Sequence, residues 1–229
     1  GYASYSSHSD QIEKGKAMSD IKILLVDDHA VVRMGFKMLI ESEPDMTVIA
    51  EAESGELGIK AYKEHKPDMV IMDITMPGIG GIEAIDRICT YDKSAKILVL
   101  SAHEDSVHPT RVLAAGALGY VTKRSAAEEL IKAIRTIKTG KKFLEPIIAQ
   151  QMAITQLSGE NNPIEVLSDR EFEVFMSLAK GKSTNEIADT MCLSPRTVGT
   201  HLYNIKQKLN ANNSAEIALI AIRCGLLEP

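Results

Sequence analysis

Five polar or charged side chains follow short apolar runs in the first half of the chain, and their types suit phosphate chemistry. Asp27 and Asp28 come after IKILLV, and Asp73 comes after MVIM. Ser101 ends KILVLS, and Lys123 ends LGYVTK. Clustered carboxylates repel one another unless a cation neutralises them, and Mg²⁺ prefers hard oxygen ligands of this kind. We therefore expect Asp73 to attack a phosphoryl group whose charge is stabilised by the metal ion and by Lys123.

The residues after Asp73 favour the same interpretation. Pro77 follows closely in ITMPGIGG, and this proline turn is expected to hold the backbone carbonyl of Thr75 within reach of the metal ion. GIGG lacks the spacing of a GxGxxG phosphate-binding loop and is interpreted as a turn that starts a helix. For Asp28 alone, a structural role at a strand end is the better interpretation. The placement of all five side chains at strand ends favours a site.

The segments around these residues predict how they are brought together. Short runs rich in Val and Ile are typical of strands, and they occur at 21–26, 47–52, 68–73, 96–101 and 118–123. Amphipathic segments of helix length lie between and after them, at 30–43, 55–65, 80–91, 105–116 and 126–139. This alternation predicts an α/β doubly wound five-stranded parallel sheet with helices on both faces. Ligands of such sheets gather at the carboxyl ends of the strands.

Composition limits the class of protein. A length of 229 residues suits two small domains, and a formal charge of −5 gives no overall basic field. Residues 1–17 are polar and Ser-rich without an apolar core, so we expect a disordered leader or tail, with Met18 as a possible natural start. No apolar run approaches the roughly 20 residues of a membrane span. Three scattered cysteines favour a reducing compartment and a cytoplasmic protein, and these are Cys89, Cys192 and Cys224.

The second half of the chain has a helical pattern. Residues 140–163 are interpreted as a linker that contains one helix, in IIAQQMAITQL, and then a polar loop. Residues 164–229 predict four helices, at 169–180, 184–191, 195–208 and 214–224. Each begins after a residue that commonly caps helices, namely Ser168, Ser183, Ser194 and Asn213. Glu171 completes a capping box with Ser168.

Residues 18–139 resemble the receiver domain of bacterial response regulators, which has a flavodoxin-like fold. The matching segments are LLVDD, VIMDITMPGIGG, ILVLSA and GYVTK. The resemblance implies that Asp73 is the phosphoacceptor and that Lys123 contacts the phosphoryl group. It implies a Mg²⁺ site formed by Asp27, Asp28, Asp73 and the carbonyl of Thr75. It also implies that Ser101 and Tyr120 act as a switch pair. Arg124 departs from the family, because many receivers have a proline there after a cis bond.

Residues 164–229 resemble the LuxR-type helix-turn-helix domain, with STNEIADTMCLS as positioning helix and turn and SPRTVGTHLYNIKQKL as recognition helix. The whole chain thus resembles response regulators of the NarL/FixJ type, in the branch that contains GacA and UvrY. Between 180 and 208, five basic residues stand against two acidic ones. The expected DNA contacts are Lys182, Arg196, Thr197, Thr200, His201, Tyr203, Asn204, Lys206 and Lys208. For His201, a base contact, a phosphate contact and a packed ring remain open.

The resemblance implies a DNA-binding transcription regulator. A partner histidine kinase would phosphorylate Asp73, and phosphorylation would promote a homodimer, to which the apolar last helix contributes in this family. The protein would catalyse only its own phosphorylation and dephosphorylation, and we expect Thr75 and His103, two residues beyond Asp73 and Ser101, to set the phosphate lifetime. A phosphatase of the haloacid dehalogenase kind needs an acid where Thr75 stands. A receiver that acts only as a protein-binding module is disfavoured by the helix-turn-helix.

Overall fold

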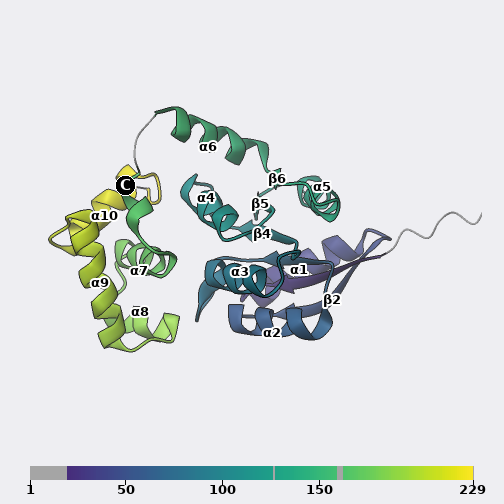
Figure 1. Ribbon diagram of the computed structural model, residues 1–229, viewed down its shortest axis with the longest axis horizontal. Coiled ribbons are helices and arrows are strands. Elements are labelled where there is room, and N and C mark those ends of the chain that lie inside the picture. The colour runs from purple at the N-terminus through teal and green to yellow at the C-terminus, as the bar shows by residue number, and fades with distance from the viewer. Residues whose placement is uncertain (1–19, 126, 159–161, 229) are drawn as a thin grey trace, which may run out of the picture.

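The computed structural model describes residues 20–125, 127–158 and 162–228, so the expected leader at 1–17 lies outside the described residues. An α/β body lies at the centre and right of Figure 1, and a body of helices lies at the left. None of the described helices is long and apolar enough to cross a membrane.

A parallel sheet forms the centre of the α/β body, as the alternating pattern predicts. Its strands lie in the order β2-β1-β3-β4-β5-β6, and every neighbouring pair is parallel. The predicted strands are β1 (Ile21–Val26), β2 (Met46–Ala52), β3 (Met69–Met72), β4 (Ile97–Ser101) and β5 (Gly119–Thr122). The short apolar runs of β3, β4 and β5 are buried along their whole length, because helices cover both faces of the sheet.

The helices divide between the two faces of the sheet. On one face, α1 (Ala30–Glu41) and α5 (Ala127–Lys138) pack against side chains such as Ile23 and Leu25. On the other face, α2 (Gly55–His65), α3 (Gly80–Tyr91) and α4 (Val107–Ala114) pack against Leu24 and Val26. Successive strand residues point to opposite faces, so one strand serves both cores.

A sixth strand corrects the prediction of five. Strand β6 (Phe143–Leu144) comes from the linker and extends the sheet beyond β5. The amide of Phe143 donates to the carbonyl of Leu118 at 2.9 Å, and the amide of Glu145 donates to Tyr120 at 3.1 Å. A run of two residues is too short to show a period, so the sequence pattern indicated only a turn there.

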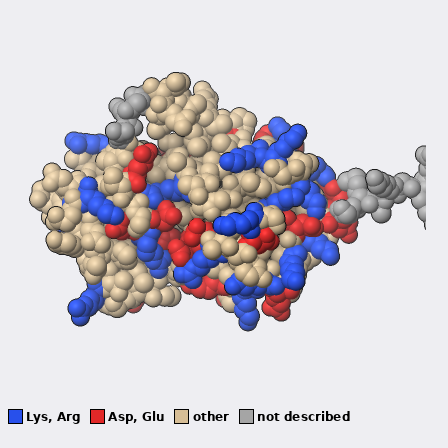
Figure 2. All heavy atoms as spheres, viewed as in Figure 1, with Lys and Arg blue, Asp and Glu red and all other residues tan. Residues whose placement is uncertain are grey.

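The linker continues into a helix, as predicted. Helix α6 (Pro146–Ser158) contains no charged residue, and it forms the uncharged ridge at the top of Figure 2. Elsewhere on this face of the molecule, basic and acidic side chains are interleaved. The next element is a short 3₁₀ helix, Pro163–Val166.

Four helices form the second body, and their bounds agree with the prediction to within one residue. They are α7 (Asp169–Ala179), α8 (Thr184–Met191), α9 (Pro195–Leu209) and α10 (Ser214–Arg223). All four predicted caps accept a backbone hydrogen bond in the first helical turn. Ser168 and Glu171 form the predicted capping box, and Ser183 forms a second one with Glu186.

The two bodies share part of a core. Val107 of α4 packs into the hydrophobic core of the helical body, beside Phe172 of α7. The guanidinium of Arg111, also on α4, lies 4.2 Å from the centre of the Phe172 ring. Helix α4 therefore anchors the helical body on the α/β body.

Candidate functional site

The predicted acidic site is assembled at the carboxyl ends of β1, β3 and β5. Strand register pairs Val26 with Met72, so Asp27 and Asp73 follow neighbouring positions on adjacent strands. Both carboxylates are buried, with 3% of each side chain exposed. The ammonium of Lys123 lies 2.6 Å from Asp27 Oδ2 and 2.8 Å from Asp73 Oδ2. The structure thus brings three of the predicted residues into direct contact.

Burial and pairing oppose each other in this cluster. Burial raises the pKa of Asp73, because desolvation outweighs its hydrogen bond from Lys123. Burial also disfavours the charged form of Lys123, but the bonds to Asp27 and Asp73 outweigh it and raise the pKa of this ammonium overall. Lys123 therefore stays charged at neutral pH and offsets one of the buried carboxylates.

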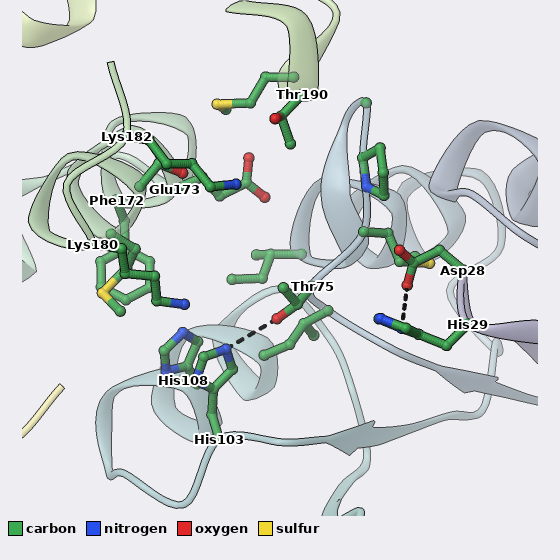
Figure 3. Close-up of a pocket in the computed structure, with 18 residues that line it drawn as sticks. Asp28, His29, Thr75, His103, His108, Phe172, Glu173, Lys180, Lys182 and Thr190 are labelled. Carbon is green, nitrogen blue, oxygen red and sulfur yellow. Dashed lines mark hydrogen bonds and ion pairs between the residues drawn. The ribbon is translucent and has the colours of Figure 1, made fainter. Parts of the chain in front are cut away.

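The carboxylates fit a divalent cation. Asp27, Asp28, His29 and Asp73 have potential ligand atoms within 4.8 Å of one another. The buried Oδ1 of Asp28 accepts no hydrogen bond from any described residue, although His29 Nδ1 lies 2.9 Å away in the ion-pair contact drawn in Figure 3. Such an unsatisfied buried oxygen, beside further carboxylates, is a suitable ligand for a hard cation.

The remaining predicted site residues form a hydrogen-bonded network beside Asp73. The amide of Thr75 donates to Asp73 Oδ1 at 3.2 Å, and Thr75 Oγ1 lies 3.0 Å from His103 Nε2 (Figure 3). Ser101 Oγ accepts from the amide of His103 at 3.1 Å. The buried hydroxyl of Tyr120 donates to the carbonyl of His103 at 2.7 Å. His103 is therefore held by three of the predicted residues.

Arg124 leaves the position of Lys123 unaffected. No described residue has a cis peptide bond, so the bond before Arg124 is trans. The Arg124 side chain is 80% exposed and points to Glu104, with 3.5 Å between charged atoms.

A cavity lies between the acidic site and the helical body. Its volume is about 270 Å³. The α/β body contributes Asp28, Thr75 and His103 to its wall, and the helical body contributes residues of and after α7, among them Lys180 and Lys182. In Figure 3 the two groups face each other across the cavity. Asp28 and Thr75 of the acidic site therefore share this cavity with residues of the helical body.

Two histidines of the α/β body connect the site with the helical body, and the sequence did not predict this connection. The rings of His103 and His108 stack at 3.9 Å, and His108 meets Phe172 of α7 edge to face at 5.1 Å. Asp105 Oδ2 lies 2.6 Å from His108 Nδ1. Burial, followed by the neighbouring His108, lowers the pKa of His103 to about 3. The two histidines in HEDSVH were the only local signal for this cluster.

A second connection joins the turn after β3 to α7 and α8. The amide of Gly78 donates to the carbonyl of Thr190 at 2.9 Å, and Arg170 donates to the carbonyl of Gly78 at 2.9 Å. Gly78 has φ 81°, a conformation that favours glycine. Gly80 has φ 73°, which also favours glycine, and a Cβ atom there would lie 2.2 Å from the carboxylate of Glu173. The GIGG segment is thus a docking turn as well as a helix start.

The predicted recognition helix α9 is open to solvent on its outer side. Arg196, Thr197, Thr200 and Tyr203 are exposed, and the α/β body packs instead against α7 and α8. No described atom comes within 4 Å of a Cβ built on Gly199. In this structure the α/β body therefore leaves the outer side of α9 uncovered.

The other predicted DNA contacts have more varied surroundings. His201 is partly buried, and burial lowers the pKa of its ring, an environment that suits a packed side chain. The ammonium of Lys208 lies 2.7 Å from Glu171 Oε2. Asn204 and Lys206 are partly exposed, and Lys182 lines the cavity between the two bodies.

Comparisons with known proteins agree with both halves of the fold. Residues 23–135 match the response regulator receiver domain, and residues 165–221 match the bacterial regulatory proteins of the luxR family. The chain is 38% identical over 210 residues to the response regulator GacA of Pseudomonas syringae pv. syringae strain B728a, covering 91% of this chain and 98% of GacA. It is 39% identical over 208 residues to the response regulator UvrY of Escherichia coli strain K12, covering 90% of this chain and 95% of UvrY.

A solved structure shows the same two-part architecture. The RcsB response regulator of Salmonella typhimurium, studied for its interaction with DNA, matches with a TM-score of 0.58 and 26% identity. The match covers 90% of this chain and 100% of that chain. The likeness thus extends through both bodies of the structure.

Proposed function

This chain belongs to the two-component response regulators that join a receiver domain to a LuxR-type DNA-binding domain, and we propose that phosphorylation of Asp73 controls its action on transcription. The observation that carries the proposal is the ammonium of Lys123, which bridges Asp27 and Asp73 at the carboxyl edge of the sheet. We assign the receiver to residues 18–139, the linker to 140–163 and the DNA-binding domain to 164–229.

The chemistry of Asp73 follows from its surroundings. A carboxylate oxygen of Asp73 attacks the phosphorus of a phosphohistidine on a partner kinase. An oxygen–phosphorus bond forms as the nitrogen–phosphorus bond breaks, and the electron pair stays on the histidine ring. Lys123 is already 2.8 Å from Asp73, so its ammonium needs only a short shift to reach a phosphoryl oxygen. The amide of Thr75, which donates to Asp73 Oδ1, keeps the carboxylate oriented.

A divalent cation fits the proposal. Asp27, Asp28, Asp73 and the carbonyl of Thr75 would hold Mg²⁺, which supplies when bound the positive charge that lets a phosphoryl dianion approach these carboxylates. The clustering of ligand atoms of Asp27, Asp28 and Asp73 within 4.8 Å of one another is the structural support for this assignment.

Ser101, Tyr120 and His103 are proposed to report the phosphoryl group and to set its lifetime. Ser101 and Tyr120 both hold the backbone of His103, so a movement of the Ser101 hydroxyl toward phosphate changes the support of His103. The His103 ring in turn contacts Thr75 and His108. These contacts link the phosphoacceptor to α4 and α7 physically.

DNA binding is assigned to α9, whose exposed side carries Arg196, Thr200 and Tyr203. Thr200 suits a thymine methyl group, and Arg196 suits a phosphate or a guanine edge. We propose that phosphorylation promotes a homodimer, because two paired half-sites multiply the affinity of a small domain for DNA. Leu219 on α10 is 45% exposed and is available for that contact. The proposed setting is the cytoplasm, where a histidine kinase and chromosomal DNA are both accessible.

The test measures phosphate on the protein and DNA binding together. The full chain is incubated with acetyl phosphate and Mg²⁺, and intact mass spectrometry follows the phosphoryl group. Asp73→Ala should abolish incorporation, whereas Asp86→Ala, which removes an exposed acid on α3, should not. Chelation of the metal should also abolish incorporation of the phosphoryl group. Selection of bound fragments from a genomic DNA pool, with and without phosphorylation, then tests control of DNA binding. Incorporation that survives Asp73→Ala would refute the assignment.

A further inference from the structure

Two lysines of the DNA-binding domain reach the cavity that Asp28 and Thr75 of the receiver also line. Lys180 ends α7, and Lys182 lies in the turn that follows. Figure 3 shows the ammonium of Lys180 pointing across the cavity toward Thr75. Both lysines thus line the same cavity, and Lys180 is the one aimed at Thr75.

The phosphorylated receiver site would carry one uncompensated negative charge, which one further cation could neutralise. Asp27, Asp28 and Asp73 carry three negative charges, and Lys123 offsets one of them. A divalent cation would offset the other two. Phosphorylation then replaces the single charge of Asp73 by about two charges on three strong acceptor oxygens. The phosphorylated site therefore has an excess of about one negative charge in a largely buried environment, where unpaired charge is costly.

The histidines around the cavity are already engaged. His103 contacts the hydroxyl of Thr75 and stacks on His108. His29 lies against the carboxylates of Asp27 and Asp28. The side chain of Lys180 has no ion pair or hydrogen bond with any described residue, and burial, followed by the nearby Lys182, lowers the pKa of its ammonium. An anion in the cavity would relieve both effects.

We propose that Lys180 of the DNA-binding domain is a second ligand of the phosphoryl group on Asp73, acting across the domain boundary. This inference rests on the proposed function, since it requires phosphate on Asp73. The contact forms after transfer, because the phosphoryl group must first be present on Asp73. Phosphorylation then ties the end of α7 to the receiver in the arrangement that leaves α9 exposed.

Amide hydrogen exchange of the full chain tests the inference. Wild type, Lys180→Met, Lys182→Met and Lys180→Arg are each phosphorylated with acetyl phosphate and Mg²⁺, and intact mass confirms the phosphate. In wild type, exchange of residues 173–182 should slow about tenfold on phosphorylation, as expected for a new charge-assisted hydrogen bond. Lys180→Met should lose this slowing, and Lys180→Arg should retain it.

Lys182→Met is the matched control, because it removes the same charge two residues away. It should slow as wild type does. If Lys182→Met loses the slowing as completely as Lys180→Met, the effect belongs to the general field and the inference is overturned. Slowing that persists in Lys180→Met, or faster exchange in phosphorylated wild type, overturns it as well. Failure of wild type to take up phosphate refutes the proposed function itself, and the mass measurement separates that result from the others.

Discussion

Replacement of Arg111 by methionine should loosen the two domains from each other. Arg111 is 11% exposed, and its guanidinium donates to the carbonyls of Ile164 and Leu167 at 2.7 and 3.1 Å. It also lies over the Phe172 ring and pairs with Asp169 at 2.8 Å. Arg111→Met preserves much of the apolar contact but removes every one of these polar interactions.

The expected cost follows from the surroundings of each interaction. Hydrogen bonds from a charged group contribute about 1.5–3 kcal/mol each, and their effects overlap at one side chain. The cation–π contact adds about 1 kcal/mol, and the pair with Asp169, which is 42% exposed, adds less than about 1 kcal/mol. We expect Arg111→Met to lower the free energy of domain opening by about 3 kcal/mol, which raises the open population on the order of 100-fold.

Native-state hydrogen exchange of residues 163–172 in the unphosphorylated chain measures this opening. Asp169→Asn should cost less than about 1 kcal/mol, because its carboxylate is partly solvated. Arg87→Met serves as the control, since Arg87 is exposed on α3 and, among the described residues, pairs only with Glu83 of the same helix. The reasoning fails if Asp169→Asn accelerates exchange as much as Arg111→Met does, because the carbonyl bonds would then be unimportant. It also fails if Arg111→Met leaves exchange unchanged.

Three further outcomes are expected. Burial raises the pKa of Glu173 from 4.5 to about 7. Domain contact should therefore be strongest below about pH 4.5 and weaken by up to about 3 kcal/mol by about pH 7. Urea unfolding at several pH values should show this fall of stability with pH in wild type, and Glu173→Gln should lose it. Substitution of both Thr75 and His103 should change the dephosphorylation rate without changing Mg²⁺ binding. Phosphate release and metal titration measure the two quantities, and an unchanged rate would contradict the assignment of these residues. Gly199→Lys should tighten DNA binding and steepen its salt dependence by about one phosphate, whereas Thr200→Ala should relax preference at one base pair by ~1–3 kcal/mol. Binding titrations at several salt concentrations, on wild-type and single-base-changed sites, distinguish the two effects. Equal weakening at all sites by Thr200→Ala would show that the proposed register of α9 is wrong.

Local rules were sufficient where the residues involved are near one another in sequence or repeat with a fixed period. Asp73 could be placed at a strand end because a run of apolar residues stops there, and parallel strands bring their ends to one edge. Ser168 and Ser183 could be placed as caps because a cap and its acceptor lie three residues apart. Resemblance to the family added the proposed switch role of Ser101, which spacing by itself leaves general.

The contacts between the domains could not be obtained in this way. Arg111 and Asp169 are 58 residues apart, and Phe143 joins the sheet through only two residues. In the sequence, Lys180 was one of five basic residues between 180 and 208, and only the packing of α7 over the receiver places it opposite Thr75. Each such contact depends on how two finished bodies fit together, and that fit is decided by the summed shape and charge of their surfaces. The sequence therefore determined the fold of each domain and the predicted phosphoacceptor, while the tertiary structure alone decided which residues of the second domain face it.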